Sequence, residues 1–161
     1  MPGFLFGKLI FFCYDWVIKN TMHVTFKRID STLPLPEYKT PGAVAFDLIA
    51  RETTVIPERG IARVPSNFIV KIPVGYMLLI RDRSSTCQKK GLFCTAGVID
   101  QDYCGDSDEL QVQYYNFLDT PVTVERGERL AQAIFIKIEK AKWQESATMA
   151  TNSRGGFGTT D

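Results

Sequence analysis

The chain has 161 residues, which is enough for one domain with a substantial core and too few for two. Its formal net charge of +1 gives no sign of a nucleic-acid-binding surface, so no nucleic-acid partner is expected. Its 4 cysteines lack the CxxC spacing of a zinc site and indicate free thiols in a reducing compartment, which favours a cytoplasmic protein, or a nuclear one in a eukaryotic or viral host.

Residues 1–21 differ in character from the rest of the chain. Their first apolar run is broken by Gly7 and Lys8, and Asp15 interrupts the second. The segment is too short and too interrupted to span a bilayer, and it lacks a clear cleavage site for a signal peptide. We interpret it as an extension outside the fold, with Met22 as the functional first residue and no membrane partner. A surface amphipathic helix is the alternative.

From Met22 the sequence alternates apolar and polar residues, which is typical of β-strands. Short apolar or β-branched segments follow one another, with proline and glycine between them. The pattern predicts an all-β barrel or sandwich, and it contains no βαβ unit of the kind found in Rossmann or P-loop folds. Strands are expected at residues 22–27, 45–50, 53–56, 60–64, 68–72, 75–80, 110–117, 122–124 and 130–138.

One short helix is predicted over residues 84–90. Ser84 and Ser85 are good residues for its start, and Gly91 is a good residue for its end. Free N–H groups and hydroxyls at such a start form a natural phosphate site, and Arg83 adds planar donors and a positive charge. An ordinary capped helix beside a surface arginine is the alternative.

The segment Gly97–Gly105 predicts a β-hairpin that carries acidic and aromatic groups. Val98 and Ile99 favour extended backbone, and the two glycines permit a tight reversal. Asp100 could take a proton from water, and the ring of Tyr103 could pack against a flat or sugar-like ligand. An acidic surface turn is the alternative.

The chain turns small and polar after Glu145, and residues 146–161 have the composition of a flexible arm. Within this arm, Arg154 and Phe157 are interleaved with three glycines. Glycine backbone can approach phosphates closely, an arginine can meet their charge, and a phenylalanine can stack on a base. A disordered tail without a role is the alternative.

Taken together, these segments resemble the trimeric dUTPase (dUTP diphosphatase) family from Met22 to the end of the chain. Five family motifs occur in the expected order. They are residues 41–48, residues 83–85 with Lys89 and Gly91, residues 97–105, residues 126–132 and residues 154–160.

The resemblance implies a jelly-roll-like β-barrel over residues 22–145, one short helix and a C-terminal arm over residues 146–161. It also implies a homotrimer with active sites at the subunit interfaces. The implied reaction is the Mg²⁺-dependent hydrolysis of dUTP to dUMP and diphosphate, by a water molecule that attacks the α-phosphate.

The resemblance also assigns roles to single residues. Asp100 corresponds to the carboxylate that activates water, and Arg154 to a catalytic cation of the arm. Tyr103 corresponds to the ring that packs under the deoxyribose and excludes a 2′-hydroxyl. Asp47 is expected to reach the metal through water, with the ion held mainly by substrate phosphates. The other implied substrate contacts are Arg83, Ser84, Ser85, Gly97, Val98, Ile99, Gln132, Gly156, Phe157, Gly158 and Thr159.

The sequence departs from the family pattern at a few positions. Ala45-Phe46 stands in place of the usual Gly-Tyr, Ser85 in place of a common glycine, and Cys104 where a long polar residue is common. None of these changes removes a group with an assigned role. The acids from Asp106 to Glu109 are interpreted as a solvated turn.

Two other functions fit parts of the pattern. A dCTP deaminase has a related fold, but its chemistry calls for a glutamate base and a different central motif from residues 100–103. A nucleotide-binding regulatory protein on the same scaffold, whose task is to bind a protein partner, is the second alternative.

Overall fold

The structure is a computed structural model that describes residues 22–149, 152 and 155. The extension at residues 1–21 therefore lies outside the described residues. The described part is almost entirely β-structure with one short helix, which confirms the predicted class. The elements are β1 (Thr25–Arg28), β2 (Phe46–Ile49), β3 (Thr54–Ile56), β4 (Ile61–Pro65), β5 (Phe68–Lys71), β6 (Tyr76–Asp82), α2 (Thr86–Lys90), β7 (Leu92–Ala96), β8 (Val98–Ile99), β9 (Gln111–Asn116), β10 (Val122–Val124) and β11 (Arg129–Lys137).

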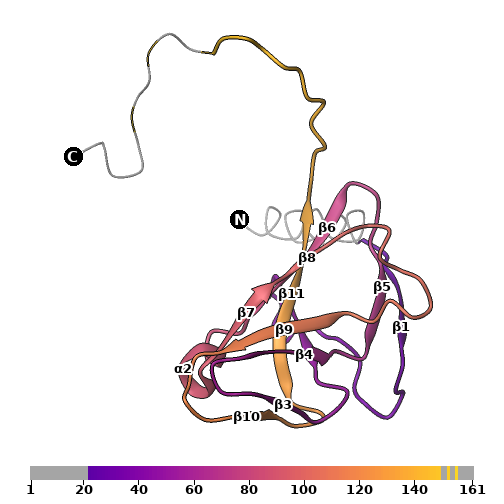
Figure 1. Ribbon diagram of the computed structural model, residues 1–161. Helices are drawn as coiled ribbons and strands as arrows, with labels where there is room; N and C mark the ends of the chain where they lie inside the picture. The colour runs from indigo at the N-terminus through magenta and orange to yellow at the C-terminus, as the bar shows by residue number, and fades with distance from the viewer. Residues whose placement is uncertain (1–21, 150–151, 153–154, 156–161) are drawn as a thin grey trace, which may run out of the picture.

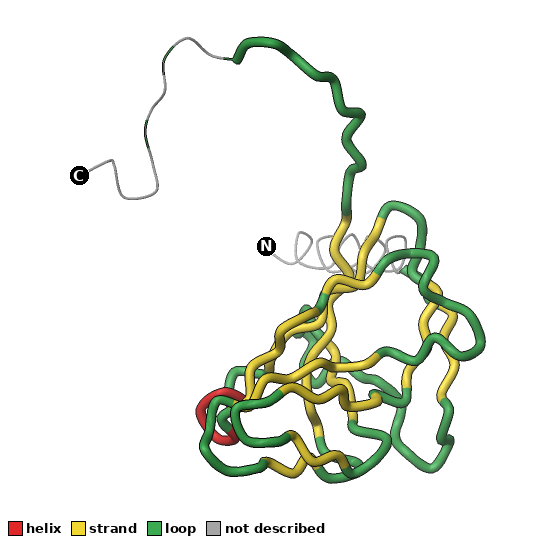
Figure 2. The backbone as a smooth tube through the Cα atoms, in the orientation of Figure 1, coloured by secondary structure: helices red, strands yellow, loops and turns green. Residues whose placement is uncertain are grey.

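The strands form small antiparallel sheets around a common interior (Figures 1 and 2). The largest sheet has the order β2-β11-β6-β8, and a second has the order β4-β9-β7. The pairs β1-β5 and β3-β10 complete the described strands. The long strand β11 pairs with β2 on one side and with β6 on the other, so it brings together three segments that are far apart in the sequence.

Alternation along the strands builds the core. In β9 every second residue is buried, and Val112 and Tyr114 are fully enclosed. Leu78 and Ile80 of β6 and Leu48 of β2 point into the same cluster. Each such apolar side chain contributes roughly 1.5–3 kcal/mol by leaving water. The core therefore fixes the strand register, and with it the positions of polar residues at the strand ends.

The expected strands are present, and their bounds differ from the predicted ones by at most three residues. Strand β7 was not predicted, because a register shift between Cys94 and Ala96 interrupts its alternation. The hairpin prediction for residues 97–105 is wrong. Val98 and Ile99 form β8, which pairs with Leu79 and Leu78 of β6 rather than with the strand that follows it. The residues after Ile99 form a loop with short turns.

Gly97 is required by the close approach of β6. The N–H of Ile80 donates to the carbonyl of Gly97 at 2.7 Å. A Cβ atom at Gly97 would lie 2.1 Å from the carbonyl oxygen of Ile80, so any larger residue would force the strands apart. This contact fixes the backbone that leads into Asp100.

A separate segment leaves the body of the molecule at the end of β11. The N–H of Ile138 still donates to the carbonyl of Gly75 at 2.8 Å. Residues 139–149 are exposed and belong to no strand, and they run away from the sheets (Figure 1). Trp143 is 95% exposed there. The sheets therefore end at Lys137, before the boundary at residue 145 expected from composition.

A chain that starts at Met22 is expected to fold with an unchanged melting temperature. The reason is that every described strand and the whole core cluster lie after this residue. Thermal unfolding followed by circular dichroism checks this. As a control, a chain starting after Arg28 also loses β1 and should melt at a lower temperature. Insolubility or a lower melting temperature of the chain starting at Met22 would show that residues 1–21 belong to the fold.

Candidate functional site

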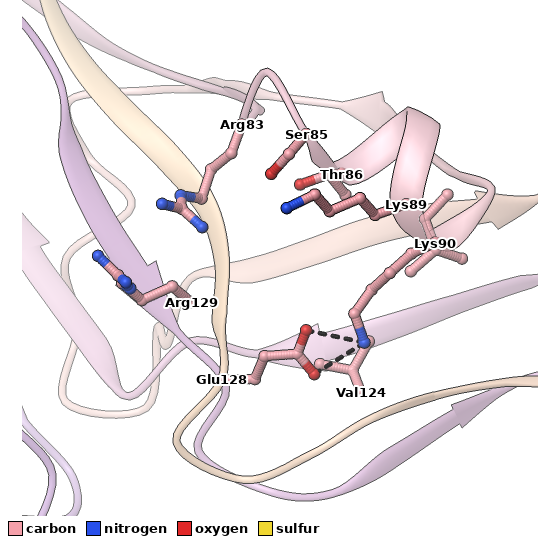
Figure 3. A pocket seen from close by; sticks show the side chains of 9 residues that line it. Arg83, Ser85, Thr86, Lys89, Lys90, Val124, Glu128 and Arg129 are labelled. Carbon is pink, nitrogen blue, oxygen red and sulfur yellow. Dashed lines mark hydrogen bonds and ion pairs between the residues drawn. The ribbon is translucent and has the colours of Figure 1, made fainter.

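A basic pocket of about 290 Å³ lies between α2 and the beginning of β11 (Figure 3). Arg83, Lys89 and Arg129 extend their charged groups toward it, and the hydroxyls of Ser85 and Thr86 lie beside them (Figure 3). Several cations next to hydroxyl donors form a set suited to a polyanion. The pocket therefore lies at the residues for which the sequence predicts a phosphate site.

Local backbone structure places these groups. The N–H of Thr86 donates to the carbonyl of Arg83 at 3.0 Å, which turns the chain directly into α2. Ser85 caps the helix with its backbone only, so its hydroxyl is not used by the helix. Gly91 ends the helix with φ of 65° and donates its N–H to the carbonyl of Cys87. Ser84, which was also expected to contact substrate, is exposed on the same turn.

Carboxylates already pair with three cations of the pocket, Arg83, Arg129 and Lys90. Asp47 of β2 accepts from Arg83 Nε at 2.9 Å and lies 3.4 Å from Arg129 Nη1. Glu128 accepts from Lys90 Nζ at 2.8 Å. The Asp47 side chain is only 13% exposed, so this pairing is partly shielded from solvent. Asp47 and Arg83, predicted from separate motifs, are therefore in direct contact.

Gln132 connects two strands of the site. It lies opposite Asp47 in β2 and opposite Arg81 in β6. Its Nε2 donates to the backbone carbonyl of Asp82 at 2.8 Å. The first, second and fourth motifs therefore meet at the neighbouring strands β2 and β11 and at the end of β6.

Asp82 belongs to the site and was missed by the sequence reasoning. Its carboxylate accepts the backbone N–H of Cys94 at 3.1 and 3.2 Å, which ties the turn before Arg83 to β7. Burial raises the pKa of Asp82, and the bond from Cys94 opposes that shift. Its only sequence signal was its position directly before Arg83.

Substitution of Asp82 is expected to change stability in a pH-dependent way. The folded-state pKa is raised, so the folded protein binds more protons and loses stability as the pH rises from about 4 through that pKa. Asp82→Asn carries no charge and should not lose stability in this way. Its melting temperature should therefore rise relative to that of wild type as the pH increases through the pKa of Asp82. Asp82→Ala leaves the Cys94 N–H without an acceptor and should cost about 1–3 kcal/mol. Thermal melts at several pH values check both results, and a pH-independent difference between Asp82→Asn and wild type would contradict the first.

The second group of predicted residues lies at the other end of β6. Ile99 is opposite Leu78, and Gln101 Nε2 donates to the carbonyl of Tyr76 at 2.8 Å. Asp100 is exposed, and Val98 is 67% exposed. Tyr103 is partly exposed, and its hydroxyl donates to the carbonyl of Glu109 at 3.1 Å. An accessible carboxylate and an accessible ring therefore share one loop.

The structure does not bring the two groups together within one chain. Asp100 follows the residue opposite Leu78, whereas Arg83 follows the far end of the same strand. At about 3.3 Å per residue, the two positions lie roughly 20 Å apart along β6. One phosphate cannot contact both side chains across that distance.

The expected solvated turn at residues 106–109 is wrong for its last residue. Glu109 is 6% exposed, because its carboxylate is enclosed by partners from other parts of the chain. Asp106 is exposed and pairs with Lys27 at 3.0 Å, and Asp108 accepts the N–H of Gly105 at 2.6 Å.

Some predicted features lie outside the described residues, and others can be assessed within them. Arg154, Gly156, Phe157, Gly158 and Thr159 fall in the part of the chain that the structure does not describe. Among residues 22–149, 152 and 155, no three His, Cys, Asp or Glu side chains gather into a cluster that could hold a metal ion. The same range contains the free thiols Cys87, Cys94 and Cys104, as expected, and no helix in it could cross a bilayer.

Comparison with known proteins settles the family. A family model described as dUTPase matches residues 31–161. The chain belongs to the dUTPase family. The deoxyuridine 5′-triphosphate nucleotidohydrolase of Brucella melitensis is 39% identical over 137 residues, covering 80% of this chain and 85% of the relative. The corresponding Dictyoglomus turgidum protein is 33% identical over 147 residues, covering 86% and 98%.

Solved structures of dUTPases share the fold. The dUTPase from Streptococcus mutans has a TM-score of 0.66 at 32% identity, covering 73% of this chain and 98% of that one. The dUTPase of Staphylococcus bacteriophage 80alpha, solved with dUPNHPP, has a TM-score of 0.75 at 22% identity, covering 86% and 98%. A mutant dUTPase from phage phi11 of S. aureus, whose structure shows a structural Mg(II) ion, has a TM-score of 0.71 at 20% identity, covering 79% and 98%. These likenesses confirm the predicted dUTPase family, its fold and its class as a nucleotide hydrolase.

Proposed function

We propose that this chain hydrolyses dUTP to dUMP and diphosphate, which limits uracil in DNA and supplies dUMP for thymidylate synthesis. The observation that carries the proposal is the basic pocket at Arg83 and Lys89 in a chain that belongs to the dUTPase family. The phosphates would contact Arg83, Ser84, Ser85 and Gln132, and the backbone from Cys94 to Val98 would meet the edge of uracil.

In this mechanism, Asp100 accepts a proton from a water molecule, whose oxygen attacks the α-phosphorus. The bond from that phosphorus to the bridging oxygen breaks, and diphosphate leaves with the electron pair. Cations stabilise the charge that spreads over the phosphate oxygens, and this is the main means of catalysis in phosphoryl transfer. Tyr103 packs under the deoxyribose, and a ribose 2′-hydroxyl would need room beside its ring.

The arm completes the proposed site after substrate has entered. Arg154 would meet the phosphates, Phe157 would stack on the base, and Gly156, Gly158 and Thr159 would contact substrate through backbone and hydroxyl groups. Closure of such a segment excludes water from the reaction.

Mg²⁺ fits this donor set as an ion carried mainly by the substrate. Magnesium is commonly held by one or two carboxylates together with substrate phosphates, and it keeps several waters. Asp47 would contact its waters, since it is the carboxylate that adjoins Arg83. The ion supplies charge neutralisation at the phosphates. The structural ion in the phage phi11 dUTPase agrees with metal use in this fold.

We also propose that the functional form is a homotrimer with its sites at the subunit interfaces. The separation of about 20 Å between Asp100 and Arg83 supports this, because a second copy can supply the missing group. An aromatic groove of about 260 Å³ lined by Phe26, Tyr38 and Phe135 gives further support. Tyr38 is 51% exposed, and such apolar surface is typical of an interface.

Turnover assays with dUTP, dCTP and UTP in the presence of Mg²⁺ test the function. Release of diphosphate from dUTP alone is the expected result. Release of ammonia from dCTP would favour the deaminase instead, and nucleotide binding without turnover would favour the regulatory protein. Light scattering on the same sample should give the mass of a trimer, and an active monomer would contradict the shared site.

A further inference from the structure

Glu109 carries a buried carboxylate that the mechanism above does not use. Its side chain is 7% exposed. Arg51 Nε donates to Oε1 and Arg51 Nη2 donates to Oε2, both at 2.9 Å. The backbone N–H of Asn67 also donates to Oε1, at 2.7 Å. Three donors aimed at one buried carboxylate form a rigid arrangement, because the two-pronged arginine contact fixes orientation as well as distance.

These contacts attach the end of the loop to a fixed part of the molecule. Arg51 follows β2, and its own N–H donates to the carbonyl of Pro65 at 2.8 Å. Asn67 exchanges two hydrogen bonds with the backbone of Asp30, at 2.6 and 2.9 Å. The side chain of Glu109 is therefore anchored on the turn between β4 and β5.

The backbone of the same residue holds Tyr103. The hydroxyl of Tyr103 donates to the Glu109 carbonyl at 3.1 Å. Between Asp100 and Glu109 the backbone of the loop pairs with no strand, and local turns close it, such as the bond from Gly105 N–H to Asp108. Side-chain contacts of Gln101 with Tyr76 and of Asp106 with Lys27 tie other parts of the loop to β6 and β1, but they do not contact Tyr103. The tyrosine ring thus takes its position from the point where the loop is anchored.

We propose that the Arg51–Glu109 pair is a positioning device that fixes the ring of Tyr103 and thereby sets the preference for deoxyribose over ribose. This inference rests on the proposed function. A ring that excludes one extra hydroxyl must be held to within a fraction of an ångström, since a mobile ring would move aside and allow a ribose 2′-hydroxyl to bind. Loss of the anchor should therefore raise activity on UTP relative to dUTP.

The test variant is Glu109→Gln, which keeps the shape and an acceptor for the Asn67 N–H but removes the charge. For the trimer with Mg²⁺, we expect kcat/KM for UTP relative to dUTP to rise by roughly tenfold, mostly through a lower KM for UTP. Arg59→Gln is the matched control. It breaks an exposed pair with Asp119, whose atoms are 2.7 Å apart, and should leave the ratio unchanged. An equal loss on both nucleotides in Glu109→Gln would overturn the inference.

A double-mutant cycle separates positioning from a merely structural role. Tyr103→Phe removes the hydroxyl that contacts Glu109 and keeps the ring. If the anchor acts through this contact, the double variant should show no larger ratio than the stronger single variant. Fully additive effects would overturn the coupling. Arg51→Lys, which keeps the charge but loses the two-pronged contact, should raise the ratio in the same direction if Glu109→Gln does not fold.

Hydrogen exchange gives a readout that does not need turnover. Amides of residues 100–108 should exchange faster in Glu109→Gln and in Arg51→Lys than in wild type, while the Arg59→Gln control stays unchanged. Unchanged exchange in both anchor variants would overturn the positioning role. Exchange could increase in the anchor variants even if wild type did not hydrolyse dUTP. In that case, the proposed function and the specificity role would both be wrong. The structural role of the Arg51–Glu109 pair would still be correct.

Discussion

Replacing Asp100 by asparagine is expected to lower dUTP turnover by about a hundredfold or more, while the fold and nucleotide binding persist. Asparagine has nearly the same shape but cannot accept the proton from the attacking water. Asp100 is exposed at the end of β8, and no described strand depends on its charge. Steady-state turnover with Mg²⁺, together with a melting curve, provides the measurement.

Asp102 supplies a matched control for this result. It lies in the same loop, and it is also exposed. Asp102→Asn should keep most of the activity, because the mechanism needs the carboxylate of Asp100 and not simply a negative charge in the loop. Near-normal turnover in folded Asp100→Asn, or an equal loss in both variants, would remove Asp100 from its assigned role.

Truncation after Glu145 is expected to reduce kcat by about a hundredfold or more, a loss comparable to that of one transition-state donor. The melting temperature without nucleotide should not change, because residues 139–149 are exposed and the last strand ends at Lys137. The removed part contains Arg154 and Phe157. Turnover and thermal melts on the truncated chain check both statements.

Single substitutions separate the roles that Arg154 and Phe157 have within the arm. Arg154→Ala should reproduce much of the loss in kcat, since the arginine meets charge on the phosphates. Phe157→Ala should weaken nucleotide binding by about 1–3 kcal/mol, the usual value of a base stacking on an aromatic ring. If the truncated chain were fully active, the fifth motif would have no function in this protein.

The fold was largely predictable because alternation and turn residues are local signals. Strands such as β9 and β10 follow directly from them. The partner of β8 was not predictable in this way, since its pairing with β6 depends on the close approach that Gly97 permits. A hairpin is the default for a short strand followed by glycine, and tertiary packing overrode it.

The site was predictable where a motif marked it and not elsewhere. Arg83, Gln132 and Asp47 belong to recognisable motifs, and the structure brings these three together. The Arg51–Glu109 pair spans 58 positions of sequence, so neither residue signals the other. An acid in a run of acids is read as solvated, and only the folded chain shows that Glu109 is enclosed.

The carboxylates that hold the basic pocket also affect how anions reach it. Asp47 lies with Arg83 and Arg129, and Glu128 lies with Lys90, so much of the positive charge is already compensated. Such a pocket projects a weaker field into solvent than its four cations would without these carboxylates. A polyphosphate enters by ligand exchange, taking over cations that the carboxylates have already oriented. Recognition there depends on contact geometry, and the rate of encounter should fall less steeply with added salt than it would for four unpaired cations.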